Sequence, residues 1–184
     1  MNDKLFKRNK GCELDVDWVM SQSANTSAIE RRAATLGTRR SIKKDHQAAW
    51  LLRAISCIDL TTLSGDDTPG RVKRLCTKAI RPIRPDLTKA LGINNLHVGA
   101  ICVYHEMIET AIAALGNSGI PVAAVSTGFP AGLSPLTTRL LEINESVLAG
   151  AKEIDIVISR RHVLTQNWQE LFNEVKAFRS ACGL

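Results

Sequence analysis

VGAICVYHEMIETAIAALGNSGIPVAAVS, residues 98–126, contains two apolar runs separated by one amphipathic segment. The runs 98–104 and 122–126 are almost continuously hydrophobic, which is typical of strands buried on both faces of a parallel sheet. Between them, apolar residues recur at helical spacing from Ile108 to Leu115, and Gly116 ends the pattern. The stretch therefore predicts a strand–helix–strand unit and an α/β fold.

Similar patterns flank this unit. Two further strands are expected at 57–60 and 154–158. Helices are expected after the capping pair Thr68-Pro69, over Leu140–Leu148 and from Trp168 to Phe178. The chain thus predicts four strand–helix units, half of an eight-fold TIM barrel of about 250 residues.

The residues before the first strand predict helices with apolar positions from Ile29 to Leu36 and from Ala48 to Ile55, with Trp50 packed among them. We expect two parts: an N-terminal helical extension, 1–55, and the incomplete first half of a barrel, 56–184. Such a half would leave two sheet edges and one apolar face uncovered. By this reading the sequence is truncated.

Composition places the chain among ordinary globular proteins, with 45% hydrophobic and 23% charged residues. No run of about 18 apolar residues exists to span a membrane, and the N-terminus lacks the apolar core of a secretion signal. Five scattered cysteines form no metal-binding pair, so reduced thiols and a cytoplasmic location are expected. The net charge is +6, and we expect the basic residues behind it to lie on solvated helix faces. Nucleic-acid binding through these residues is a distant alternative.

Three residues near the carboxyl ends of predicted strands are candidates for chemistry, because barrel enzymes place their reactive groups there. Asp155 interrupts the apolar strand EIDIVI and is costly to bury without a partner or a function. Asp59 ends the first strand, although a turn-capping role would also explain it. Cys102 lies near the end of the second strand, where a buried space-filling role is the alternative.

Several motifs in order resemble the class I 2-deoxyribose-5-phosphate aldolases, in particular the animal form. They are IDLTTL at 58–63 followed by DDT at 66–68, AICVY at 100–104, GFPAG at 128–132 and GAKEIDIVI at 150–158. ELD at 13–15 and QAAWLL at 47–52 also fit, so that the resemblance covers nearly the whole chain from about residue 10.

This resemblance implies reversible cleavage of 2-deoxy-D-ribose 5-phosphate to glyceraldehyde 3-phosphate and acetaldehyde, in deoxyribonucleoside catabolism. A lysine Schiff base would serve as the electron sink, with no metal and no cofactor. Asp155 would take part in a proton relay with a second lysine, Asp59 would support the charged network, and Cys102 would be a non-essential thiol in the site wall. The partner implied is a phosphorylated deoxysugar.

The lysine motifs of that family, KTSTG and KPAGG, do not occur in residues 1–184. Lys152 precedes the fourth strand and does not match the Schiff-base position. We therefore expect this chain alone to be inactive. The alternative function is a non-catalytic half-barrel that pairs with a second copy of itself or with another chain.

Overall fold

The computed structural model describes residues 10–39 and 41–183. Its contacts divide the chain into two compact units, residues 1–40 and 41–184. The predicted domain boundary after residue 55 lies beyond helix α3 (Lys44–Ile55), which belongs to the second unit. That boundary stays a prediction.

Within residues 10–39, the first unit contains two helices, α1 (Val16–Ser21) and α2 (Thr26–Leu36). Each begins at a side-chain cap: Asp15 accepts a hydrogen bond from the backbone N–H of Trp18, and Asn25 accepts one from that of Ala28. The helix predicted around Ile29 to Leu36 is present as α2, whereas α1 was not predicted. No residue of either helix is buried.

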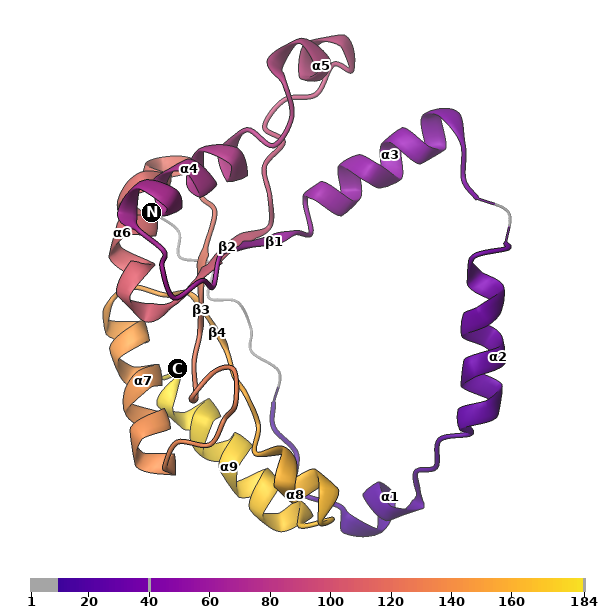
Figure 1. Cartoon of the computed structure of the whole chain (residues 1–184), viewed down its shortest axis with the longest axis vertical. Helices are drawn as coiled ribbons and strands as arrows, with labels where there is room; N and C mark the ends of the chain where they lie inside the picture. Colours follow the sequence, from indigo (N-terminus) through magenta and orange to yellow (C-terminus); the bar gives the residue numbers. More distant parts are fainter. Residues whose placement is uncertain (1–9, 40, 184) are drawn as a thin grey trace. The chain divides into compact units, whose positions relative to one another are not determined.

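The second unit is built on a four-stranded sheet. Its strands are β1 (Asp59–Thr61), β2 (Ala100–Val103), β3 (Val122–Val125) and β4 (Glu153–Asp155). Their spatial order is β1-β2-β3-β4, and every pairing is parallel (Figure 1). The predicted α/β fold with a parallel sheet is confirmed, although each strand is shorter than its apolar run. Strand β4 ends at Asp155, and beyond it the hydroxyl of Thr127 bonds to the backbone of Val157 in place of the ladder.

Each strand of the sheet is followed by one or two helices. They are α4 (Pro69–Ile80), α5 (Pro85–Ala90), α6 (Ile108–Leu115), α7 (Leu136–Leu148), α8 (Arg160–Leu164) and α9 (Trp168–Ala181), with short 3₁₀ turns at His105–Met107 and Gly116–Ser118. The predicted helices are present, whereas the short α5 and α8 were not predicted. Trp50 in α3 does not pack as expected, because 63% of it is exposed.

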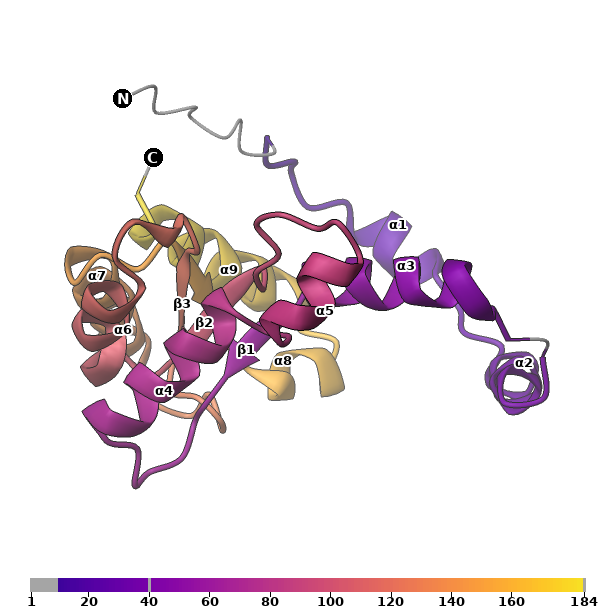
Figure 2. The ribbon, with the colours of Figure 1, turned by 90° about the horizontal axis from the view of Figure 1, so that it is seen from above.

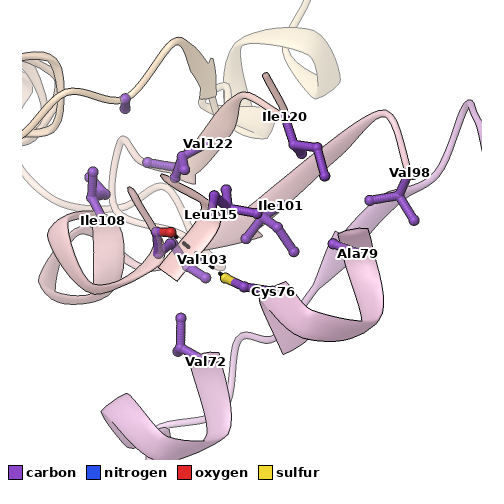
Figure 3. Close-up of a cluster of buried hydrophobic side chains, with 13 residues drawn as sticks. Val72, Cys76, Ala79, Val98, Ile101, Val103, Ile108, Leu115, Ile120 and Val122 are labelled. Atoms are coloured by element: carbon purple, nitrogen blue, oxygen red, sulfur yellow. Dashed lines mark hydrogen bonds between the residues drawn. The ribbon is translucent and has the colours of Figure 1, made fainter. Parts of the chain in front are cut away.

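The main core lies between one face of the sheet and helices α4 and α6, which pack on each other and on the strands (Figure 2). Ile101 and Val103 point into it from β2, opposite Val72 and Cys76 of α4 (Figure 3). The Cys76 thiol donates to the carbonyl of Ala111 in α6, with 3.8 Å between sulfur and oxygen. This contact gives the buried thiol a hydrogen-bond partner, so Cys76 has a packing role in the core.

On the other face of the sheet, a smaller cluster of side chains packs against the strands. Cys102, Ala123 and Val125 are buried there, and partly buried side chains pack against them from the loops that follow the strands: Leu63, Tyr104 and Phe129. Because side chains alternate along a strand, this face also carries every second residue of the edge strands β1 and β4. We call it the open face, and it holds the candidate site.

Candidate active site

The open face brings together two of the residues singled out from the sequence. Asp155 is paired with Val125 of β3, and Cys102 with Ala123, so both point to the same side of the sheet. The Cys102 Sγ donates a hydrogen bond to the Asp155 Oδ2, with 3.6 Å between the atoms. The two residues are 53 positions apart in the sequence, and they lie on β2 and β4, on either side of β3.

The environment of Cys102 keeps its thiol protonated. Burial raises the pKa of this thiol to about 11, and the negative charge and hydrogen-bond acceptance of Asp155 act in the same direction. The charge of Asp59 adds a smaller increase in pKa, whereas a hydrogen bond with Thr61 opposes it. Cys102 is therefore a weak nucleophile at neutral pH, because the thiolate is the reactive form. This agrees with a place in the wall of the site.

Asp155 itself is exposed, contrary to the expectation of a buried carboxylate in an apolar strand. The reason is positional: it ends β4, an edge strand, and it faces the side of the sheet that α4 and α6 do not cover. Ile154, which points the other way, packs against the main core. The strand is thus apolar on one side and carries its acids on the other.

A pocket of about 580 Å³ lies over the carboxyl ends of the strands on this face. It is lined by Thr61, Leu63, Cys102, Val125, Phe129, Ile154, Asp155, Ile156 and Val157. Most of these residues are apolar, with a carboxylate, a thiol and a hydroxyl among them, which is the usual make-up of a small-molecule site. The pocket also lies at the strand ends, where α/β enzymes bind their substrates.

Asp59 lies on the open face but outside this lining. The prediction that Asp59 ends the first strand is wrong, because β1 runs from Asp59 to Thr61 and Asp59 begins it, opposite Ala100 of β2. The backbone carbonyl of Asp59 accepts a hydrogen bond from the Thr61 hydroxyl at 2.8 Å. Its influence on the site is electrostatic, since its charge raises the pKa values of both Cys102 and Glu153. The structure therefore places Asp59 near the candidate pair and does not bring it into contact with them.

Glu153 is an acid of the open face that the sequence interpretation did not assign. It stands two residues before Asp155 on the same side of β4. Burial raises its pKa, and the charges of Asp59 and Asp155 raise it further. The strict alternation of Glu153, Ile154 and Asp155 was a sequence signal that could have identified it.

Basic residues are missing from the pocket lining among the described residues. Lys152 lies at the amino end of β4, where its backbone N–H donates to the carbonyl of Val122 at 2.8 Å. This is the end of the sheet opposite the pocket. Within residues 10–39 and 41–183, no group of three His, Cys, Asp or Glu side chains is arranged to hold a metal ion. The same residues include no helix with the length and apolar character that a membrane crossing requires.

Comparisons with known proteins agree with the geometry. A family model described as DeoC/LacD family aldolase matches residues 53–184. The chain is 51% identical over 183 residues to the deoxyribose-phosphate aldolase of Bos taurus and 50% identical over 183 residues to that of Homo sapiens. Each alignment covers 97% of this chain and 58% of the relative, so the chain spans less than two thirds of the length of these proteins.

Solved structures share the fold at lower identity. The aldolase QR15 matches with a TM-score of 0.55 and 21% identity, over 69% of this chain and 50% of that one. The tetrameric deoxyribose phosphate aldolase of Aeropyrum pernix matches with a TM-score of 0.51 and 23% identity, over 72% and 50%. The predicted fold class is confirmed: the four parallel strand–helix units are part of an aldolase-type TIM barrel. The chain belongs to the DeoC/LacD family of aldolases.

Proposed function

We propose that this chain supplies the first half of the active site of a deoxyribose-phosphate aldolase. The substrate would be 2-deoxy-D-ribose 5-phosphate, cleaved to glyceraldehyde 3-phosphate and acetaldehyde through a lysine Schiff base and without a metal. The observation that carries this proposal is the Cys102–Asp155 pair at the strand ends of a DeoC/LacD family sheet. The free thiols of this chain support a cytoplasmic location.

Asp155 is the catalytic residue in this proposal. Its exposed carboxylate lines the pocket and can take part, with a second lysine, in a relay that moves a proton to and from the carbon beside the imine. The Cys102 thiol donates to this carboxylate and does not itself react, since its pKa of about 11 keeps it protonated. Asp59 supports the site through its charge.

The charge of the open face indicates which group should meet it. Asp59, Glu153 and Asp155 carry three carboxyl groups on one side of the sheet, and the described pocket lining contributes no cation. Such a face attracts a protonated amine and repels a phosphate. We therefore propose that both the reactive lysine and the phosphate-binding groups lie outside residues 1–184, and that this chain alone forms no Schiff base.

Borohydride trapping tests this directly. The purified chain and the full-length Bos taurus relative are each incubated with 2-deoxyribose 5-phosphate and borohydride. The mass of each protein is then measured by mass spectrometry. We expect a reduced adduct on the relative and none on this chain, because reduction fixes only an imine that has formed. A stable adduct on the 184-residue chain would overturn the proposal.

A chimera tests the role of Asp155. Residues 1–184 are joined to the part of the Bos taurus relative that lies beyond the aligned region. If this chimera cleaves the substrate, Asp155→Asn should lower kcat by about 10²- to 10⁴-fold, the contribution typical of general acid–base catalysis. The matched control is Glu170→Gln, an exposed carboxylate of α9, which should leave kcat unchanged. Equal rates for both variants would remove Asp155 from the mechanism.

The open edges of the sheet favour a second candidate function, a non-catalytic half-barrel that pairs with another copy. Among residues 10–39 and 41–183, strands β1 and β4 each pair on one side only, and such edges are templates for further pairing. Light scattering after size exclusion would measure the mass of the particle. A folded monomer at micromolar concentration would rule out obligate pairing.

A further inference from the structure

The loop that follows β3 is fastened to the segment that follows β4. The regular ladder ends with the N–H of Ser126 donating to the carbonyl of Asp155 at 2.9 Å. At the next residue, Thr127, the backbone turns to a φ of +61° and leaves the ladder. Its side-chain hydroxyl then takes over both roles of a paired strand: it accepts from the N–H of Val157 at 2.6 Å and donates to the carbonyl of Val157 at 3.0 Å.

This arrangement is unusual for the residue type. A β-branched residue rarely adopts a left-handed φ, and such strain persists only where the surroundings impose it. Thr127 is completely buried, and the next residue is held as well, because the N–H of Gly128 donates to Glu142 of α7 at 2.7 Å. The conformation is therefore fixed from both sides.

A second contact supports the same segment. Gly132, at the far end of the loop, has a φ of +69° and lies so close to Val157 that an added Cβ would be 2.8 Å from its Cγ1. Thr127 thus bonds to the backbone of Val157, two residues beyond Asp155, and Gly132 lies close to the Val157 side chain. Val157, Asp155 and Phe129 of this loop all line the pocket.

We propose that Thr127 is a positioning residue for Asp155: its hydroxyl holds the segment 155–157 in place after the ladder ends and so keeps the carboxylate against Cys102. The inference rests on the proposed role of Asp155 and deepens it. Loss of the hydroxyl frees Val157 and lets the Asp155 side chain move away from the thiol.

The thiol of Cys102 reports on this placement without any catalysis. Its pKa is raised first by burial and then by Asp155 and Asp59, so displacement of the Asp155 carboxylate lowers it. The rate of iodoacetamide alkylation as a function of pH, followed by mass spectrometry on the tryptic peptide 90–139, gives this pKa because Cys102 is the only cysteine in that peptide. Asp155→Asn defines the full effect of removing the charge.

Thr127→Val should produce at least half of the pKa decrease seen with Asp155→Asn, and Thr127→Ser should restore the original value. Thr127→Gly removes the hydroxyl without backbone strain, and it should shift the pKa as Thr127→Val does. Ile143→Val, a buried change in α7, is the control for a general loss of stability and should leave the thiol pKa unchanged.

The double variant T127V/D155N separates positioning from looser packing. If Thr127 acts through Asp155, the double variant has the same Cys102 pKa as Asp155→Asn alone. A further decrease, or single Thr127 variants that lower stability with no change in the thiol pKa, would overturn the proposal. Because the measurement needs only the folded chain, its failure is distinct from failure of the trapping or chimera experiments.

Discussion

The buried ion pair between α7 and α9 makes a quantitative prediction about stability. Glu174 accepts hydrogen bonds from the guanidinium of Arg139 at 2.6 Å, from the backbone N–H of Ser159 at 2.7 Å and from the Ser159 hydroxyl. The side chains of Arg139 and Glu174 are only 6% and 5% exposed. The guanidinium also lies 5.2 Å from the centre of the Phe178 ring. The network joins two helices to the segment that follows β4.

Glu174→Gln keeps the size of the side chain and removes its charge. Arg139 is then a buried cation without a carboxylate, and its Nε and Nη1 already have no hydrogen-bond partner among the described residues. Breaking a buried pair in this way typically costs about 3–5 kcal/mol of unfolding free energy. With a urea m-value of about 2 kcal/mol/M, the midpoint should fall by about 1.5–2.5 M.

Urea titration followed by far-UV circular dichroism measures this change. The R139M/E174M double variant should recover most of the loss, since apolar replacement of a buried pair is often neutral or stabilising. Glu170→Gln, an exposed acid in the first turn of α9, should cost less than about 1 kcal/mol.

The stability lost in Glu174→Gln should also depend on pH. Burial of Glu174 opposes its ionisation, but hydrogen bonds from Ser159 and the interactions with Arg139 outweigh this and lower its pKa below the ordinary 4.5. A lowered folded-state pKa gives stability that is complete above the unfolded-state value and is lost as the pH falls through the folded-state value. The gap between the chain and Glu174→Gln should therefore be full at pH 6 and shrink in acid below about pH 4. A gap under about 1 kcal/mol, or one of equal size at pH 3 and pH 6, would refute the reasoning.

Substitutions at Gly132, Thr68 and Ile101 test the packing and the cap of α4. Gly132→Ala should lower the unfolding free energy by about 1–3 kcal/mol, because the left-handed φ of Gly132 and its contact with Val157 disfavour a Cβ. Gly65 has open space around it, so Gly65→Ala should lower the unfolding free energy far less in the same urea titration. Thr68→Ala removes the cap that accepts the Arg71 N–H at the start of α4 and should cost about 1 kcal/mol, measured by chemical denaturation; no change would show that the cap is replaced by water. Ile101→Ala at the centre of the core should cost about 2–5 kcal/mol and Ile101→Val about 0.5–1.5, and equal midpoints for the two variants would contradict a well-packed site.

Much of the fold was predictable because its signals are local. Thr68 caps α4 as its sequence pattern indicates, and Gly116 ends α6 where apolar periodicity stops. The short helices α5 and α8 carry too few turns to show a period, so they were missed. The packing of Trp50 was wrong because an amphipathic pattern says which face is apolar and does not say what covers it.

The candidate site was predictable in part. Cys102 and Asp155 were singled out separately by their positions near the ends of parallel strands, and the structure joins the two by a hydrogen bond. The exposure of Asp155 could not be predicted, because it depends on which face of the sheet the helices cover. Thr127 gave no signal either, since nothing in its neighbours indicates a left-handed threonine whose hydroxyl continues a ladder.

The order β1-β2-β3-β4 has a consequence for synthesis on the ribosome. Each strand pairs with the strand made immediately before it, so no segment has to wait for a later one before it finds its neighbour. Chains emerge from the N-terminus and fold progressively as they lengthen. The register of each new strand is then templated by one already in place, and a displaced β2 would pass its error to every strand that follows.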